Sequence, residues 1–336
     1  MQHLPVFVVM PQRLLLLDVA GPIEVLRRGN IEQDQVQFDV IFVAAEEQVT
    51  TSVGLQLAHL NPLPANLPSK AMIVLVGSVD SVLGSSEQPE GDPDEDGVLV
   101  NWLRTSVRPE HCLVTICSGA LLAGRAGLLD GRACTTHHHD CDLLQEMVPS
   151  AEVKRNHLYV QDGNVYSSAG VTAGIDLMLH LLEQLTGHDC AVRVARYLVV
   201  YLRRAGADPQ LSPWIQERDH IHPAVIRVQD AIRRDPTRAW TRPELAKLAG
   251  SSGRHLSRLF QQHTGMIMAE YRNRICVALA RELLSKSQLD MELVAERSGF
   301  ESARQLRRAW GKVYETPPGQ VRIARGTSSD FLPCLQ

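Results

Sequence analysis

Cys117 is the residue in this sequence with the clearest chemical potential. The segment Thr115-Ile-Cys-Ser-Gly-Ala120 predicts a strand that turns directly into a helix at the cysteine. Such an elbow lifts a nucleophile above the edge of a sheet, and the positive end of the helix dipole favours the thiolate. We therefore expect Cys117 to line a cleft, where it could contact a ligand or be oxidised. A buried structural cysteine is the alternative interpretation.

A run of three histidines, His137-His-His139, lies downstream of this elbow, and His137 is the candidate partner for the thiol. A metal site needs ligands that converge on one point. Consecutive residues on a strand or loop point in different directions, so only a subset of these side chains could converge. We therefore predict no metal site and no cofactor.

A second kind of chemistry, nucleic-acid binding, is indicated by a repeat near the C-terminus. Ala246-Lys-Leu-Ala-Gly250 is echoed by Ala295-Glu-Arg-Ser-Gly299, and Leu256-Ser-Arg-Leu-Phe260 is echoed by Leu306-Arg-Arg-Ala-Trp310. Each copy has an alanine that lets two helices approach, a glycine that makes the turn and an apolar pair that anchors the second helix. The repeat predicts two helix-turn-helix units in an all-α C-terminal domain.

The second helix of each unit is expected to read DNA bases. A helix predicted over 266–284 joins the units and spans roughly 30 Å, close to the 34 Å of one duplex turn. Arginine can bind guanine through two hydrogen bonds, and glutamine can do so with adenine. The candidate base-reading residues are Arg254, Ser257, Arg258, Arg304, Gln305 and Arg308.

The charge distribution supports DNA binding by this domain. Residues 220–326 contain 19 Lys/Arg against 10 Asp/Glu, whereas the whole chain contains 34 against 38 and has a net charge of −4. A basic segment on an otherwise acidic chain is typical of nucleic-acid binding. An ordinary helical bundle with basic solvated faces is the alternative interpretation.

The elements that position Cys117 alternate between strands and helices. Strands are predicted over 5–10, 36–45, 71–76 and 112–116, and helices over 20–28, 96–107, 118–126 and 189–204. This alternation predicts a parallel sheet with helices on both faces, and ligands of such folds lie beyond the carboxyl ends of the strands.

Length and composition limit the number of domains and the class of protein. A chain of 336 residues predicts about two domains, and an apolar fraction of 44% is ample for buried cores. No apolar run is long enough to span a membrane, and no signal-peptide pattern is present at the N-terminus. The seven cysteines are scattered without a CxxC pair, which favours free thiols in a reducing cytoplasm.

The motifs of both halves resemble known families. Leu17-Asp-Val-Ala-Gly-Pro22, Cys117-Ser-Gly-Ala120, Gly127-Leu-Leu-Asp-Gly-Arg132, Thr135-Thr-His137 and Ser168-Ala-Gly-Val-Thr-Ala-Gly-Ile-Asp176 resemble the PfpI/ThiJ-like domain of the class I glutamine amidotransferase superfamily. Gly299-Phe-Glu-Ser-Ala-Arg-Gln-Leu-Arg-Arg-Ala-Trp310 and Glu315-Thr-Pro-Pro-Gly-Gln-Val-Arg322 resemble AraC/XylS-type regulators. In this order the two resemble GlxA-type transcription regulators.

The resemblance implies a flavodoxin-like α/β sensor domain over 1–204, a linker over 205–220 and an AraC/XylS-type DNA-binding domain over 221–326. It places Asp18, Cys117 and His137 around one ligand pocket. Ser118 stands where the protease-like members have histidine, so no catalysis is expected. A PfpI-type hydrolase with an accessory helical domain, and a regulator that senses oxidation of Cys117, are the alternatives.

The partners implied by the resemblance are promoter DNA, a small-molecule effector of unknown identity, a second copy of the chain and, for an activator, RNA polymerase. Such regulators are often activators of catabolic operons. The expected location is the cytoplasm, at the nucleoid through DNA binding.

Overall fold

The computed structural model describes residues 1–79, 82–83, 96–200, 204–210, 222–314 and 316–323. The chain divides into two compact units, and the first unit runs from Met1 to Gln210. The two units are described separately below. In the described residues, no helix is both long and apolar enough to cross a membrane.

The first unit is built on a seven-stranded sheet with the order β11-β12-β8-β7-β1-β3-β6. All neighbouring pairs are parallel except β11 and β12. The strands are β1 (Gln2–Met10), β3 (Val36–Ala44), β6 (Asn61–Pro62), β7 (Met72–Leu75), β8 (Cys112–Ile116), β11 (Tyr159–Asp162) and β12 (Val165–Ser168). Four of these, β1, β3, β7 and β8, confirm the predicted strands within three residues at either end.

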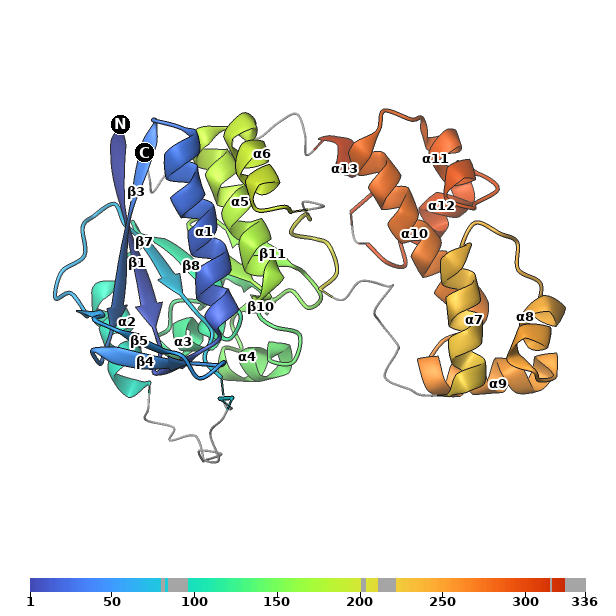
Figure 1. Ribbon diagram of the computed structural model, residues 1–336, viewed down its shortest axis with the longest axis horizontal. Coiled ribbons are helices and arrows are strands. Elements are labelled where there is room, and N and C mark those ends of the chain that lie inside the picture. Colours follow the sequence, from blue (N-terminus) through green and yellow to red (C-terminus); the bar gives the residue numbers. More distant parts are fainter. Residues whose placement is uncertain (80–81, 84–95, 201–203, 211–221, 315, 324–336) are drawn as a thin grey trace. The chain divides into compact units, whose positions relative to one another are not determined.

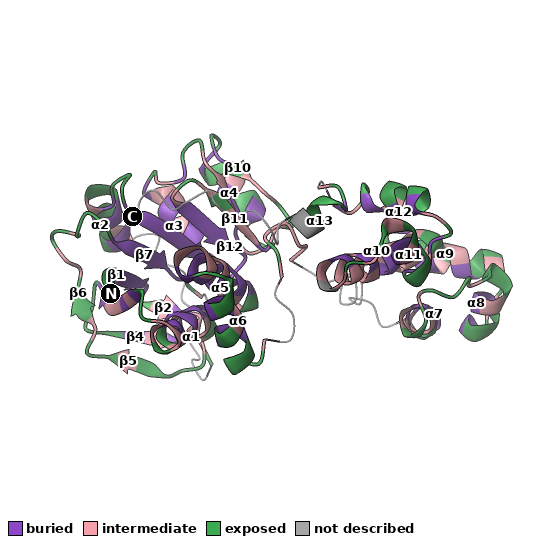
Figure 2. Ribbon diagram, turned by 90° about the horizontal axis from the view of Figure 1, so that it is seen from above, coloured by how far each residue is buried: buried purple, intermediate pink, exposed green. Residues whose placement is uncertain are grey.

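Helices cover both faces of this sheet. One face carries α1 (Leu16–Glu32), α5 (Thr172–Thr186) and α6 (His188–Tyr197), and the other carries α2 (Gly97–Ser106), α3 (Gly119–Arg125) and α4 (Cys141–Met147). Figure 2 shows the buried strands between these two layers. Alternate residues of β1 explain the arrangement, because Val6 and Val8 join the core under α1 and α5 while Phe7 and Val9 join the core on the other side.

Short strands form two smaller sheets beside the main one. A three-stranded sheet has the order β2-β4-β5, and a two-stranded sheet pairs β9 with β10. Their bounds are β2 (Arg13–Leu14), β4 (Gln48–Thr51), β5 (Gln56–Ala58), β9 (Ala133–Cys134) and β10 (Glu152–Val153).

Helix α1 begins earlier than the sequence predicted. We expected a helix entered through Gly21-Pro22, but α1 starts at Leu16 and contains Pro22. The two residues serve a close helix crossing instead: a Cβ on Gly21 would lie 2.8 Å from Ile175 Cγ1, and a Cβ on Gly174 would lie 3.0 Å from Pro22 Cγ. The earlier start places Asp18 in the first turn of α1.

Helix α6 ends earlier than predicted. The amphipathic pattern suggested a helix over 189–204, but α6 stops at Tyr197, and Val199 has a left-handed φ of 55°. A β-branched residue in that conformation is incompatible with a continuing right-handed helix. Arg204 instead binds Asp176 of α5, with its N–H 3.0 Å from Oδ1 and its Nε 2.8 Å from Oδ2.

The second unit is all helical in the described residues. Its helices are α7 (Pro223–Arg234), α8 (Arg242–Ala249), α9 (Gly253–Thr264), α10 (Met268–Lys286), α11 (Met291–Arg297), α12 (Ala303–Trp310) and α13 (Gln320–Ile323). Helix α10 connects two separate cores. Tyr271 and Ile275 pack with α7, α8 and α9, whereas Val277 and Ala280 pack with α11 and α12.

The predicted linker, 205–220, falls partly within the first unit. The backbone oxygen of Gly206 accepts the N–H of Leu158 at 2.8 Å, and Gln210 Nε2 donates to the carbonyls of Thr136 and His157. Residues 211–221 lie outside the described residues. The domain boundaries given by the sequence therefore stay a prediction.

Candidate functional site: the cysteine elbow and the paired helices

The predicted elbow at Cys117 is present. Strand β8 ends at Ile116, Cys117 adopts a left-handed φ of 56°, and α3 begins at Gly119. A hydrogen bond of 3.0 Å from the Cys117 N–H to the Ser168 carbonyl fixes the turn against β12. A non-glycine residue in this conformation is strained, and such strain persists only where surrounding contacts enforce it.

Glycines from two neighbouring loops make room for this strained residue. A Cβ on Gly170, which follows β12, would lie 2.2 Å from Cys117 Cβ, and a Cβ on Gly77, which follows β7, would lie 2.9 Å from it. No side chain larger than hydrogen fits at either position. Cys117 therefore lies among the carboxyl ends of β7, β8 and β12, where ligands bind in parallel α/β folds.

Asp18 lies beside the cysteine and is fully buried. Its Oδ1 accepts a 2.6 Å hydrogen bond from the N–H of Val171, a β-branched residue with a left-handed φ of 51°. Burial raises the pKa of Asp18 to about 6, and the hydrogen bonds from Val171, Cys117 and Gly77 act in the opposite direction. Near neutral pH this carboxyl group can therefore exist in either protonation state.

The structure does not support the expectation that helix α3 favours a thiolate at Cys117. Burial raises the pKa of the thiol far above its ordinary value, and the negative charge of Asp18 raises it further. The N–H of Ser118 lowers it by less. Burial next to a carboxylate therefore outweighs the start of the seven-residue helix α3, and the pKa of Cys117 is raised rather than lowered.

His137 does not pair with the thiol. No hydrogen bond joins its ring to Cys117 within the described ranges, and the carboxylates that act electrostatically on the thiol are those of Asp18 and Asp140. The connection between the two segments runs through Thr136, whose hydroxyl donates to the Cys117 carbonyl at 2.8 Å. The structure thus brings Asp18 and Cys117 together and leaves His137 as the neighbour of Thr136.

The histidine run differs from the expectation in a second way. We expected consecutive side chains to diverge, but His137, His138 and His139 place ligand nitrogens within 4.8 Å of one another. The reason is a reverse turn, closed by the hydrogen bond from the Asp140 N–H to the His137 carbonyl at 2.8 Å. Burial lowers the pKa of His137 and His138, which favours neutral rings.

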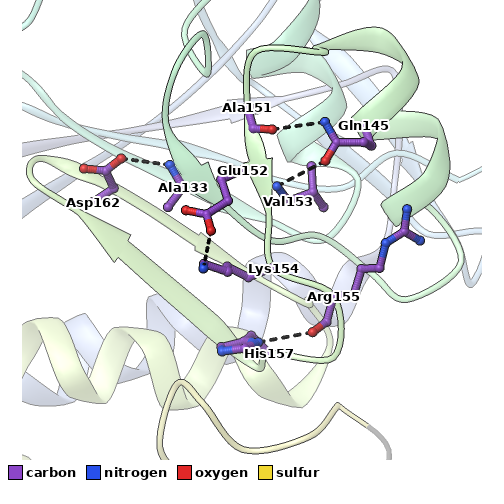
Figure 3. Close-up of polar contacts among 9 residues, drawn as sticks. All are labelled: Ala133, Gln145, Ala151, Glu152, Val153, Lys154, Arg155, His157 and Asp162. Carbon is purple, nitrogen blue, oxygen red and sulfur yellow. Dashed lines mark hydrogen bonds and ion pairs between the residues drawn. The ribbon is translucent and has the colours of Figure 1, made fainter. Parts of the chain in front are cut away.

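Polar contacts hold the segment that carries Thr135 and Thr136. The N–H of Ala133 donates to Asp162 Oδ2 at 2.8 Å, and Gln145 bridges Ala151 and Val153 (Figure 3). The N–H of Thr135 donates to the buried Ser167 Oγ at 2.8 Å. These contacts tie β9, β10 and the turn after them to the edge of the main sheet.

Sequence reasoning missed several residues of the elbow. Gly77, Gly170 and Val171 surround Asp18 and Cys117, yet none was singled out for a role. Gly170 and Val171 belong to the motif Ser168-Ala-Gly-Val-Thr, which was noted only as a mark of resemblance. Its two consecutive residues with positive φ, including a valine, are visible only in three dimensions.

The two helix-turn-helix units of the second domain are confirmed in detail. Gly250 and Gly299 both have left-handed φ values, 66° and 84°. The following N–H groups, of Ser251 and Phe300, donate to the carbonyls of Ala246 and Ala295. Both second helices are then capped by serine, Ser252 for α9 and Ser302 for α12.

The candidate base-reading side chains differ in availability. Arg254, Arg258, Arg304 and Arg308 are exposed. The half-buried Ser257 donates its hydroxyl to the Gly253 carbonyl at 2.9 Å. The amide of Gln305 is engaged with Glu301, to which its Nε2 donates at 2.8 Å. The exposed Arg254, Arg304 and Arg308 can therefore meet DNA without exchanging a partner. Arg258 contacts His255 Nδ1 at 3.3 Å, so it must exchange a partner, as must Ser257 and Gln305.

Two cavities flank α10 on the side of these helices. One, of about 620 Å³, is lined by Ser257 and Gln261 of α9, and the other, of about 440 Å³, by Gln305 and Arg308 of α12. Asn273 of α10 lines both. The two cavities therefore meet at the N-terminal part of α10, where Ile267, Ala269 and Asn273 line both.

Comparison with known proteins agrees with both units. The profile of the DJ-1/PfpI family matches residues 5–184, more than half of the chain. The chain belongs to the DJ-1/PfpI family. A helix-turn-helix domain profile matches residues 245–324, so this member carries an AraC-type helix-turn-helix domain after its flavodoxin-like DJ-1/PfpI domain. The predicted fold class is thereby confirmed.

Individual relatives carry different names. The HTH-type transcriptional regulator GlxA of Rhizobium meliloti is 32% identical over 63% of this chain and 65% of its own length. The match therefore spans just under two thirds of that relative. The HTH-type transcriptional regulator GbdR of Pseudomonas aeruginosa is 24% identical over 91% of this chain and 81% of its own. The isonitrile hydratase of Pseudomonas putida is 30% identical over 55% and 73%.

Proposed function

We propose that this protein is a sequence-specific DNA-binding transcription regulator whose DJ-1/PfpI domain binds a small-molecule effector. The observation that carries the proposal is the pair of equivalent helices α9 and α12. Each follows a glycine turn, each is capped by serine, and together they expose four arginines. Relatives named as HTH-type transcriptional regulators support the same conclusion.

The spacing of the two helices suits one face of duplex DNA. Helix α10 has 19 residues, which corresponds to about 28 Å at 1.5 Å per residue. Because its two ends belong to the two cores, it holds α9 and α12 at a fixed separation. Successive major grooves lie about 34 Å apart on one face of the duplex. Each second helix would enter one of them.

The elbow is proposed as the effector site. Cys117 supplies a neutral thiol, and Asp18 supplies a carboxyl group that can be protonated near pH 6. A protonated Asp18 can donate a hydrogen bond, and it lies beside Cys117. An effector with a hydrogen-bond acceptor would satisfy that group.

The remaining partners follow from DNA binding. Two copies of the chain would occupy two half-sites, since one pair of helix-turn-helix units covers a single half-site. As an activator of a catabolic operon, the protein would also contact RNA polymerase. These proposals place it in the cytoplasm, on promoter DNA.

Selection of bound fragments from genomic DNA, with the purified full-length protein, tests the proposal. The expected result is enrichment of a few intergenic sites that share one sequence motif. A matched protein with Arg254, Arg258, Arg304 and Arg308 replaced by alanine should enrich none. Recovery of random fragments by both proteins would contradict sequence-specific binding.

Catalysis by the first domain is a second candidate. The strained Cys117 and the adjacent Asp18 could act as nucleophile and general acid, and one relative is named isonitrile hydratase. The neutral thiol weighs against this candidate because nucleophilic catalysis requires the thiolate. Turnover of an isonitrile that is abolished by Cys117→Ala would establish catalysis. Absence of isonitrile turnover, together with specific DNA binding, would favour a sensor role for the first domain.

A redox regulator is the other alternative. Oxidation proceeds through the thiolate, so burial beside Asp18 should protect Cys117 from mild oxidants. A titration of DNA binding against hydrogen peroxide separates the alternatives. DNA binding that changes with peroxide in the wild type but not in Cys117→Ala would favour oxidation as the signal.

A further inference from the structure

The three imidazole rings of His137, His138 and His139 form a compact cluster outside the elbow. The ring centres of His137 and His138, and those of His138 and His139, lie 4.2 Å apart, and those of His137 and His139 lie 5.0 Å apart. Each ring offers a nitrogen such that all three nitrogens lie within 4.8 Å of one another.

The backbone explains why three consecutive side chains converge. In an extended segment they would alternate between two faces. Here the chain reverses at once, because Asp140 N–H closes a turn onto the His137 carbonyl and α4 starts at Cys141. The turn is anchored on its other side by Thr136, whose hydroxyl donates to the Cys117 carbonyl. The cluster is therefore held by the fold.

We propose that His137, His138 and His139 bind a divalent transition-metal ion of the Zn²⁺, Ni²⁺ and Cu²⁺ class. Imidazole is a preferred ligand of these ions, with metal–nitrogen distances of about 2.0–2.1 Å. Two nitrogens on a tetrahedral ion then lie roughly 3.4 Å apart. Side-chain rotations that bring the nitrogens together by about 1–1.5 Å would complete the site, and no hydrogen bond holds these ring nitrogens within the described part of the chain.

The surroundings suit a cation with nitrogen ligands. The Asp140 carboxylate interacts electrostatically with His137 and His138 and would offset part of the ion's charge. Cys141 is adjacent in sequence, but it is buried and its Sγ is directed at the carbonyls of Thr136 and His137, 3.8 and 3.6 Å away. The site therefore uses imidazole without thiolate, and a fourth position remains for water or an exchangeable ligand.

This site borders the proposed effector site, since the Asp140 carboxylate acts on Cys117 as well as on His137 and His138, but its occupancy does not depend on the proposed function. The ion would sit on the turn that follows Thr136, whose hydroxyl donates to the Cys117 carbonyl. The binding itself can be measured whether or not the protein regulates transcription.

Metal binding to the full-length protein, prepared without a histidine tag, tests the proposal. Isothermal titration with Zn²⁺ and Ni²⁺ should give one ion per chain. Titration with Co²⁺ should give the visible absorption of a tetrahedral ion without the intense near-ultraviolet band of a thiolate ligand. His139→Gln, at an exposed position, should weaken binding at least about tenfold, a loss seen even for residues that only support a ligand.

The matched variants decide the outcome. The triple replacement of His137, His138 and His139 by glutamine should abolish binding, while His188→Gln, at an exposed histidine on α6, should leave it unchanged. Circular dichroism checks that the triple variant is folded. If the triple variant is unfolded, His139→Gln alone provides the test of the site. Absence of binding by the wild type, equal binding by His139→Gln, or a thiolate band with Co²⁺ would overturn the proposal.

Discussion

Asp18, in the first turn of α1, accepts a 2.6 Å hydrogen bond from the N–H of Val171, which immediately precedes α5. The bond joins residues 153 positions apart. It holds Val171 at a left-handed φ of 51° and keeps Gly170 against Cys117. One buried carboxyl group thus organises the whole elbow, and its protonation state should influence both stability and thiol reactivity.

Asp18→Asn should change how stability depends on pH. The folded-state pKa of Asp18 is raised from its ordinary value of 3.8 to about 6, so the folded chain retains a proton that the unfolded chain releases. The retained proton stabilises the folded state, and this stabilisation is fully present below about pH 4. It is lost as the pH rises through about 6. The difference between these two pKa values corresponds to about 3 kcal/mol. Urea unfolding should show the wild type losing about that much relative to the variant between pH 4 and 7. A difference that stays constant over this range would refute the raised pKa.

Cys117 should react slowly with iodoacetamide at pH 8, because burial and the Asp18 charge both raise the pKa of its thiol. Asp18→Asn removes the charge and should accelerate alkylation. Mass spectrometry of the peptide that contains Cys117 gives the rate, and Cys117→Ala provides the blank. Alkylation of the wild type as fast as that of a free thiol in solution would mean that the thiolate is present after all.

The equivalent turn glycines of the two helix-turn-helix units should differ in their tolerance of alanine. Both have positive φ, which costs a non-glycine residue about 1–2 kcal/mol. A Cβ on Gly250 would have its nearest contact 3.9 Å away, whereas a Cβ on Gly299 would lie 2.8 Å from the Thr237 backbone. Gly299→Ala should therefore lower the melting temperature more than Gly250→Ala. Equal shifts in melting temperature would show that the backbone near Thr237 moves readily to make room for the added methyl group.

The full-length protein should form dimers on DNA, since one chain supplies helices for a single half-site. Sedimentation at micromolar concentration, with and without the selected DNA fragment, measures the assembly. Two chains per fragment are expected. One chain per fragment at saturation would contradict a paired half-site arrangement.

The sequence predicted those features that depend on local pattern. The alternating strands, the elbow at Cys117 and both glycine turns follow from periodicity, turn chemistry and capping residues, and the structure has all of them. The start of α1 was missed because proline was taken for a helix start, although Pro22 lies inside the helix at a crossing with α5. Here tertiary packing overrides a local rule.

The chemistry of the site was harder to predict than its position. The pKa of Cys117 depends on burial and on Asp18, ninety-nine positions earlier, and neither is visible in the elbow motif. The convergence of His137, His138 and His139 depends on one turn hydrogen bond. Both features arise from contacts between segments, which spacing along the chain does not encode.

The most direct test of the proposed function is a quantitative footprint of the full-length protein on a selected genomic site. Each chain should protect two segments about one helical turn apart. Arg254→Ala and Arg304→Ala should each cost about 1–3 kcal/mol and relax the preference at one base position. Arg307→Ala, at an exposed position beside the base-reading face, should weaken binding to all sequences alike. It should also reduce the slope of log affinity against log salt concentration by about one. Protection of a single segment, or unchanged affinity of the Arg254 and Arg304 variants, would contradict the account.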